Sequence, residues 1–248
     1  MIVFPMAGLS KRFFNEGFKI PKYMLTAHGK TLFYWAIIGF QRYFKDQKFL
    51  FICRNQFETK QFLEENCTNL GIRNFQIVEL DAETLGQAHT VSLGLNIAQI
   101  PINEPVTIFN IDTFRFGFEF PEIVEEPSIA GYLECFIGEG SNWSNVVTES
   151  NGSSRVIRTS EKKNESDLCC TGLYYFFSVG CFLNCYREYY SLTEKDQNAE
   201  HYIAPIYNSL ISSGAVVKVQ IIDRSSVIFC GTPSEYSEFK AAKFEPIN

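Results

Sequence analysis

Short apolar runs alternate with helix-like segments through the first 112 residues, and this alternation restricts the fold more than any other feature. The apolar runs predict four buried strands, at residues 2–6, 48–54, 75–80 and 105–112. The segments between them predict three helices, at residues 31–44, 57–70 and 85–99. Apolar strands separated by helices are typical of a parallel sheet that is covered on both faces. We therefore expect an α/β fold, built as a Rossmann-like three-layer sandwich.

The second half of the chain has a different pattern, with loops rich in Asn, Ser and Gly. It predicts strands at residues 129–137, 144–149, 155–160, 169–177, 216–223 and 226–230. It also predicts helices at residues 179–192 and 199–213 and a last helix that begins near Pro233. No linker of disordered composition and no internal repeat divides the chain. We therefore expect a single domain over residues 1–248, with a mixed, mainly parallel central sheet and two halves, 1–115 and 116–248.

Charge and cysteine content argue against several classes of protein. The formal net charge of −6 disfavours binding to a nucleic-acid polymer, which requires many cations to neutralise phosphates. The eight cysteines lie mostly within apolar runs, which predicts buried thiols rather than disulfides or a zinc site. Strand character begins at residue 2, and no apolar run reaches about 18 residues. We therefore expect a cytoplasmic protein without a signal peptide or a membrane span.

A turn rich in cations follows the first strand, in the segment Met6-Ala-Gly-Leu-Ser-Lys-Arg-Phe13. Its small residues let backbone amides approach a ligand closely, and Lys11, Arg12 and Lys22 lie nearby in sequence. The segment matches neither the dinucleotide-binding G-x-G-x-x-G nor the P-loop G-x-x-x-x-G-K-[ST]. Cations on a tight loop at the end of a strand nevertheless suit a polyphosphate. The alternative interpretation is a solvated basic turn.

Asp112 ends the fourth apolar run and is the candidate metal ligand. In an open parallel sheet, ligands bind beyond the carboxyl ends of the strands. Asp112 and the cationic turn would therefore share one edge of the sheet, where a carboxylate can hold Mg²⁺ on phosphate oxygens. The alternative is an Asp that only begins a turn.

Several blocks along the chain keep the order found in sugar-phosphate nucleotidyltransferases. They are Ala7-Gly8 with Arg12, Pro21-Lys22, Met24-Leu25, Gly29-Lys30, Thr84-Leu-Gly-Gln-Ala88, Asn110-Ile-Asp112, Glu161-Lys162, Thr171-Gly-Leu-Tyr-Tyr-Phe176 and Gly231-Thr-Pro233. The chain resembles this family over nearly its whole length. The resemblance implies a GT-A-like fold and a reaction that joins a nucleoside triphosphate to a phosphorylated small molecule with release of pyrophosphate. Members usually carry a second Gly in the first loop, where this chain has Leu9 or Ser10.

The resemblance also implies roles for individual residues. The catalytic cations would be Arg12, Lys22 and Lys11. The first half would bind the nucleotide through Met6, Ala7, Gly8, Leu9, Ser10, Glu79, Thr84, Gly86, Gln87 and Asn110. The second half would bind the acceptor through Glu161, Lys162, Thr171 and Gly172. Asp112 would hold Mg²⁺, and Asp223 is the candidate for a second ligand because the family's usual position for that ligand is Phe229 here.

The nucleotide base is suggested by Glu79. If Glu79 faces the base, its carboxylate accepts from the exocyclic amine of cytosine and repels the carbonyl of uracil or thymine, which favours CTP. Otherwise Glu79 is a solvent-exposed strand end. The acceptor stays open among phosphoglutamine, phosphocholine and hexose 1-phosphates, and the resemblance is to enzymes of capsule or surface polysaccharide biosynthesis. Cytidylyltransferases of capsular phosphoramidate biosynthesis, which act on phosphoglutamine, are among them.

Two other classes of protein stay open at this stage. A glycosyltransferase would normally show D-x-D, where this chain has Asn110-Ile-Asp112, and would lack the pair of Arg12 and Lys22. A nucleotide-binding regulator without turnover is the other alternative, suggested by the missing Gly in the loop and by Phe229. The expected partners are a nucleoside triphosphate and a phosphorylated small-molecule acceptor, with no membrane and no nucleic-acid polymer. A homo-oligomer is left open.

Overall fold

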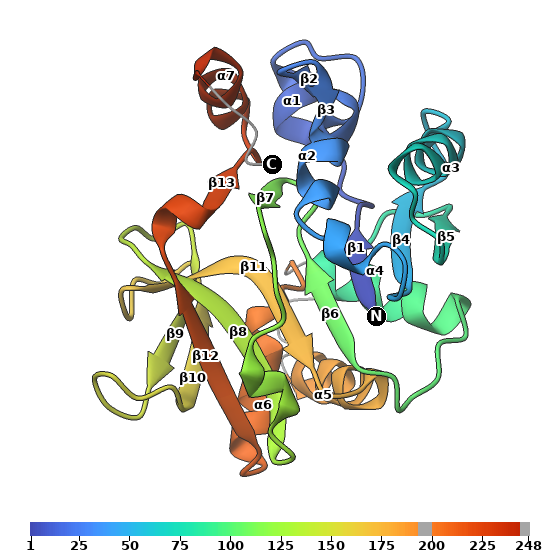
Figure 1. The fold of residues 1–248 in the computed structure, drawn as a ribbon. Coiled ribbons are helices and arrows are strands. Elements are labelled where there is room, and N and C mark those ends of the chain that lie inside the picture. The colour runs from blue at the N-terminus through green and yellow to red at the C-terminus, as the bar shows by residue number, and fades with distance from the viewer. Residues whose placement is uncertain (193–199, 244–248) are drawn as a thin grey trace.

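The computed structural model describes residues 1–192 and 200–243 of the chain. A sheet of nine strands forms its centre (Figure 1). These strands are β1 (Ile2–Pro5), β4 (Phe49–Arg54), β5 (Phe75–Leu80), β6 (Val106–Phe109), β8 (Ile129–Ile137), β9 (Ser144–Thr148), β10 (Val156–Glu161), β11 (Leu168–Phe176) and β12 (Val216–Ile222). Two small sheets accompany it, formed by β2 (Thr26–Ala27) with β3 (Lys30–Thr31), and by β7 (Thr113–Arg115) with β13 (Val227–Phe229).

Seven α-helices lie within the described residues: α1 (Lys11–Asn15), α2 (Leu32–Ile38), α3 (Thr59–Leu70), α4 (Gln87–Ile97), α5 (Val179–Leu192), α6 (Tyr207–Ser212) and α7 (Pro233–Ala241). Short 3₁₀ turns are η1 (Lys22–Met24), η2 (Gln41–Tyr43), η3 (Glu122–Glu125), η4 (Ala204–Ile206) and η5 (Arg224–Ser226).

The central sheet is mixed, and strands from both halves of the chain share it. The strands of the first half, β5, β4, β1 and β6, are parallel and adjacent in that order. β11 then pairs antiparallel with β6 and carries β8 and β9 on its other side. β12 lies parallel to β8, so that only β10 and β11 run against the other seven strands. The predicted α/β fold with a mixed, mainly parallel sheet is confirmed.

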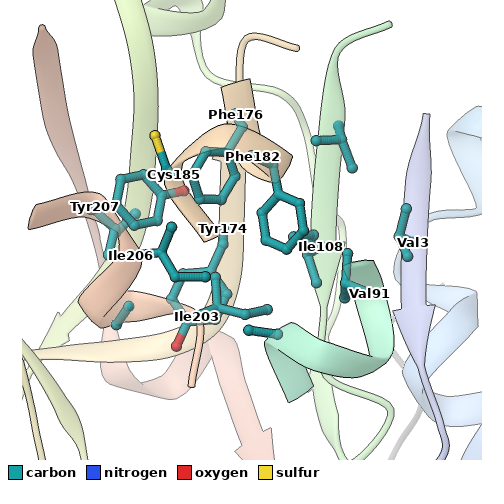
Figure 2. Close-up of a cluster of buried hydrophobic side chains, with 14 of the residues drawn as sticks. Val3, Val91, Ile108, Tyr174, Phe176, Phe182, Cys185, Ile203, Ile206 and Tyr207 are labelled. Carbon is teal, nitrogen blue, oxygen red and sulfur yellow. The ribbon is translucent and has the colours of Figure 1, made fainter. Parts of the chain in front are cut away.

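Alternate residues of each parallel strand face opposite sides of the sheet and belong to separate apolar cores. Val3 and Ile108 face the side covered by α4, α5 and η4, where they join the cluster shown in Figure 2. Phe4 and Phe51 face the side of α2 and α3, where aromatic rings dominate. Burial on both faces explains why these strands are apolar without alternation.

The remaining predicted elements are confirmed with small shifts at their ends, except for two helices. The predicted helix at 31–44 ends at Ile38, and a 3₁₀ turn follows. Gly39 lies between them against the backbone of Arg115, where a side chain would collide. The predicted helix at 199–213 is replaced by η4 and α6, with Pro205 at the start, and residue 199 lies outside the described residues. The predicted buried thiols are confirmed, since all eight cysteines are free and seven are buried.

Helix α7 packs against the segment that follows β1, although the two are far apart in sequence (Figure 1). The Tyr236 hydroxyl donates to the carbonyl of Thr26 at 2.9 Å, and its ring lies edge-on to those of Phe13 and Phe18. A capping box of Thr232 and Glu235 begins the helix. The last described helix therefore supports the loop that carries the cations. No helix within the described residues has the length and apolarity that a membrane crossing needs.

Candidate active site

The loop after β1 leaves the sheet with an accessible backbone. The Met6 amide still donates to the carbonyl of Ile52 at 2.7 Å, and Ala7 is buried. Gly8 is exposed, and nothing lies within 4 Å of the place where its Cβ would be. Ser10 then adopts a left-handed backbone with φ of 49°, and its hydroxyl accepts from the Lys22 amide at 3.3 Å. The loop can therefore present its backbone to a ligand.

Lys22 and Asp112 meet at the carboxyl edge of the sheet. Lys22 Nζ donates to Asp112 Oδ2 at 2.5 Å, and both side chains are about one-fifth exposed. The carbonyl of Asp112 accepts from the Cys230 amide at 2.8 Å, and a Cβ on Gly231 would lie 3.0 Å from Asp112 Oδ2. The absent side chain of Gly231 thus leaves room for the carboxylate. The predicted proximity of Lys22 to Asp112 is confirmed.

Lys11 and Arg12 lie exposed on α1, and neither forms an ion pair with another residue in the described part of the chain. Burial raises the pKa of Tyr202, and Glu200 raises it further, whereas Arg12 opposes the shift. The Arg12 guanidinium is therefore within electrostatic reach of the Tyr202 hydroxyl, and the two halves face each other here.

The turn before α4 contacts both halves of the site. Gln87 Nε2 donates to Asn110 Oδ1, and a Cβ on Gly172 would lie 2.2 Å from Asn110 Nδ2. Gly86, with φ of 139°, lies against the backbone of His201, whose nitrogen would be 2.6 Å from a Cβ there. These contacts bring four of the predicted residues into one cluster.

Two further residues of the predicted nucleotide site have protein partners. The Thr84 hydroxyl is 2.8 Å from that of Thr90 on α4, so it secures the start of the helix. Glu79 lies on the α3 side of the sheet, where its Oε2 is 3.6 Å from Lys60 Nζ. Gln87, by contrast, begins the helix that covers the other side. The carboxylate of Glu79 remains 30% exposed.

The predicted acceptor residues Glu161 and Lys162 belong to a polar cluster at the end of β10. The Ser144 hydroxyl donates to Glu161 Oε2, and burial raises the pKa of Glu161 although Ser144 and Lys162 oppose this. Lys162 Nζ donates to the Tyr202 hydroxyl, which in turn donates to Glu200 Oε2. Lys162 is also 3.8 Å from Glu200 and has a left-handed φ of 53°. The cluster offers two carboxylates and one ammonium group to a ligand.

Thr171 is a buried residue of β11 that bonds to Glu134 of the neighbouring strand β8. Its side chain is buried, and its hydroxyl donates to Glu134 Oε1 at 3.0 Å. Arg115 Nε donates to both oxygens of Glu134, at 3.2 and 3.1 Å. The hydroxyl of Thr171 is therefore buried and bonded within the protein, which leaves it closed to the direct contact with a ligand that was predicted. It holds the irregular part of β11 that contains Gly172.

Asp112 is the candidate for a metal ligand, and Asp223 is engaged elsewhere. The Asp223 carboxylate accepts from the amide and the hydroxyl of Ser225, at 2.7 and 2.5 Å, and these bonds lower its pKa. Phe229, at the family's usual second position, packs on Trp143. The described residues contain no group of three or more His, Cys, Asp or Glu placed to hold a metal ion. One carboxylate together with substrate phosphates and water still fits Mg²⁺.

Three residues of the polar cluster were not predicted, namely Ser144, Glu200 and Tyr202. Each is an ordinary polar residue in its own segment, and tertiary contacts bring it to Glu161 and Lys162. A family alignment could have identified them, but spacing within one sequence could not.

No protein-family model matches the sequence, and no curated protein matches it significantly. Among solved structures, the nucleoside-diphosphate-sugar pyrophosphorylase of Vibrio cholerae RC9 is 48% identical, with a TM-score of 0.93. The match covers 98% of this chain and 100% of that one. The chain belongs to this family of sugar-phosphate nucleotidyltransferases. The resemblance predicted from the sequence blocks is thus confirmed at the level of the family.

More distant solved structures share the fold of this nucleotidyltransferase. The inositol-1-phosphate CTP transferase of T. maritima is 16% identical over 97% of this chain and 94% of that one, with a TM-score of 0.68. An apo UDP-glucose pyrophosphorylase is 17% identical over 96% of each chain, with a TM-score of 0.72. Identities this low show a shared fold alone, and the two proteins differ in the nucleotide that they are named for.

Proposed function

We propose that this protein transfers a nucleoside monophosphate from a nucleoside triphosphate, with CTP favoured, to a phosphorylated small-molecule acceptor, releasing pyrophosphate. The observation that carries the proposal is the pair of Lys22 and Asp112, 2.5 Å apart beside an exposed glycine loop. Lys11 and Arg12, which follow this loop, form no ion pair with the described residues. Family membership supports the same reaction class. We propose phosphoglutamine as the first acceptor to test, in capsule or surface polysaccharide biosynthesis, with phosphocholine and hexose 1-phosphates as alternatives.

The proposed mechanism relies on positioning and charge neutralisation. A phosphate oxygen of the acceptor attacks the α-phosphorus, and the bond from that phosphorus to the bridging oxygen of the β-phosphate breaks. The attacking phosphate is anionic at neutral pH, so no general base is required. Arg12 and Lys11 bind the triphosphate and the departing pyrophosphate, while Lys22 steadies the reacting phosphate. The acceptor lies against Glu161 and Lys162, whose cluster can accept from amide or hydroxyl donors and pair with a phosphate.

Mg²⁺ is the proposed cofactor, with Asp112 as its protein ligand. When bound, the ion neutralises charge on the phosphate oxygens. Asp112 is suited to this because its carboxylate lies next to Lys22 and beside the small residue Gly231.

The preference for CTP depends on Glu79. A carboxylate accepts from the exocyclic amine of cytosine and repels the carbonyl at the same place in uracil or thymine. Lys60 is 3.6 Å from this carboxylate, which leaves one-third of the side chain exposed for a further contact. Glu79→Gln, which can donate as well as accept, should therefore relax the preference towards UTP or dTTP. An unchanged order of preference in this variant would remove Glu79 from base recognition.

The deciding experiment is a pyrophosphate-release screen of four nucleoside triphosphates with Mg²⁺. The acceptors are phosphoglutamine, phosphocholine and several hexose 1-phosphates. Pyrophosphate release with one phosphorylated acceptor supports the proposal, and a response limited to CTP supports the assignment of the base. Transfer of sugar from a nucleotide sugar, without release of pyrophosphate, would instead identify a glycosyltransferase. Tight nucleotide binding without any turnover would identify a binding protein.

A further inference from the structure

Two aromatic rings join α1 to the loop between β4 and α3. Phe14 of α1 and Phe57 of that loop are stacked, with ring centroids 5.7 Å apart and planes 18° from parallel. Phe57 is 47% exposed, so about half of its side chain stays open to solvent although its ring packs on Phe14. The stack lies beside Lys11 and Arg12, which belong to the same five-residue helix as Phe14.

A second contact joins the same loop to the segment that carries Lys22. The Tyr23 hydroxyl lies 3.0 Å from Thr59 Oγ1, and both side chains are buried. Thr59 begins α3 and donates to the carbonyl of Gln56 at 2.6 Å. Residues 57–59 therefore contact both segments that present cations to the proposed triphosphate site.

Backbone strain accompanies these contacts. Phe57 and Glu58 both have left-handed φ angles, 54° and 51°, and Ser10 just before α1 has 49°. A non-glycine residue in this region is unfavourable by about 1–2 kcal/mol. Such strain persists only where the surrounding structure holds it, and it gathers at functional sites. Of the six described non-glycine residues with positive φ, these three lie next to the Phe14–Phe57 stack or within it, and Lys162 lies in the polar cluster at the end of β10.

We propose that residues 57–59 position the cations of the nucleotide site, with Phe57 holding α1 through Phe14 and Thr59 holding Lys22 through Tyr23. The inference rests on the proposed function, because it assigns a task to cations that bind a triphosphate. Phe57 and Tyr23 are positioning residues, since neither needs to touch the ligand. The geometry predicts different kinetic effects from the two contacts.

The test compares Phe57→Ala with Phe57→Tyr and with Phe177→Ala. Phe57→Ala should raise the KM for the triphosphate about 5–10-fold and change kcat less than twofold, because ground-state and transition-state binding weaken together. Phe57→Tyr keeps a stacking ring and should restore the wild-type KM. Phe177 is 48% exposed at the end of β11, far in the fold from α1, so Phe177→Ala is a matched control. Tyr23→Phe should instead lower kcat several-fold with little change in this KM, because Lys22 contacts the reacting phosphate.

Hydrogen exchange provides a readout that does not depend on activity. The amides of residues 11–15 should exchange faster in Phe57→Ala than in the wild type, and at wild-type rates in Phe177→Ala. An unchanged KM or unchanged exchange in Phe57→Ala overturns the inference, as does a Phe57→Tyr variant that behaves like Phe57→Ala. If the wild-type protein releases no pyrophosphate from any triphosphate, the proposed function fails. The exchange measurement then still decides whether Phe57 holds α1.

Discussion

Ser10 adopts a left-handed backbone conformation that glycine usually provides. The family usually has a second Gly in this loop, and Ser10 adopts the left-handed backbone that Gly reaches at no steric cost. Its hydroxyl accepts from the Lys22 amide, which a glycine cannot do. Ser10 therefore adopts a backbone that favours Gly and adds a bond to a proposed catalytic segment.

Gly172 permits the contact between Gln87 and Asn110. Because a Cβ at Gly172 would lie 2.2 Å from Asn110 Nδ2, Gly172→Ala should displace the Asn110 side chain and reduce activity at least tenfold. Gly214→Ala is the matched control, since Gly214 has a similar φ of 83° and nothing lies within 4 Å of its Cβ position. Both variants carry a backbone penalty of about 1–2 kcal/mol. Equal activity in the two, measured as pyrophosphate release, would show that the collision at Asn110 has no consequence.

The roles of the cations Arg12 and Lys22 can be tested by single substitutions. Arg12→Ala and Lys22→Ala should each lower kcat/KM about 10²–10³-fold, which is the range for the loss of a single charge-stabilising donor. Lys19→Ala removes a nearby exposed cation to which the mechanism gives no role and should stay close to wild type. Circular dichroism should show the same folded protein in all three. A fully active Lys22→Ala would refute the role assigned to Lys22.

At the scale of elements, the turn before α4 is joined to the segment around His201. The His201 amide donates to the carbonyl of Leu85 at 2.7 Å, and the Ala88 amide donates to the carbonyl of His201 at 2.9 Å. His89 Nδ1 accepts from the Leu85 amide at 3.0 Å, and the Tyr186 hydroxyl is hydrogen-bonded to His201 Nδ1 at 2.9 Å. The nucleotide side and the acceptor side of the site thus share one set of hydrogen bonds.

This junction predicts a loss of stability in mild acid. Burial lowers the pKa of both His89 and His201 below the usual 6.5, and proximity to His89 lowers that of His201 further. The unfolded chain therefore binds more protons than the folded one as pH falls through about 6.5, so the free energy of unfolding decreases. The Tm should be highest above that pH and should fall towards pH 5.5. His89→Asn keeps an acceptor near the position of Nδ1 without a titrating ring, and an unchanged slope of Tm against pH in this variant would contradict the assignment.

The long elements were predictable because each satisfies its own pattern. β4 is an apolar run that is buried over all but its last residue, and α3 ends at Gly71, which has the left-handed φ expected after a helix. α1, η1 and the hairpin of β2 and β3 were not predicted. These are too short for periodicity to identify, and their conformations depend on contacts with distant residues such as Tyr236.

Across the whole molecule, a buried ion pair joins strands from both halves. Glu134 of β8 is 3% exposed and contacts Arg115 of β7 and Thr171 of β11. Burial raises the pKa of Glu134, and Arg115 opposes the shift most strongly. The pair of Glu134 and Arg115 lies close to the candidate site. Arg115 follows Asp112 in the chain, and Glu134 bonds to Thr171, the neighbour of Gly172.

Breaking this pair should destabilise the whole fold. Glu134→Ala leaves Arg115 without its carboxylate in a site that is largely closed to water, so the free energy of unfolding should fall by about 3–5 kcal/mol. Urea denaturation followed by tryptophan fluorescence measures this change. Lys218 and Glu126 form an ion pair that is more exposed, and Glu126→Ala should cost less than about 1 kcal/mol. A similar decrease in the free energy of unfolding in both variants would show that burial does not make the pair of Glu134 and Arg115 more stabilising than an exposed pair.

Part of the candidate site was predictable, because its position follows from the order of strands in a parallel sheet. Lys22 and Asp112 could be placed together because parallel strands send their carboxyl ends to one edge. The surroundings of Glu79 and the buried position of Thr171 could not, because each depends on which face of a strand meets Lys60 or Glu134. Side-chain direction at the end of a strand is decided by packing, and packing involves segments that a local pattern does not contain.

The contacts of α7 have a consequence for how the protein acquires its activity. Cys230 fixes the backbone of Asp112, and Tyr236 covers Phe13 and Phe18 beside the first loop. A ribosome releases Cys230 and Tyr236 long after the glycine loop, because most of the sequence lies between them. A growing chain can therefore complete most of its sheet while its first dozen residues still lack their support. Competence to bind substrate should therefore appear late and abruptly, once α7 docks.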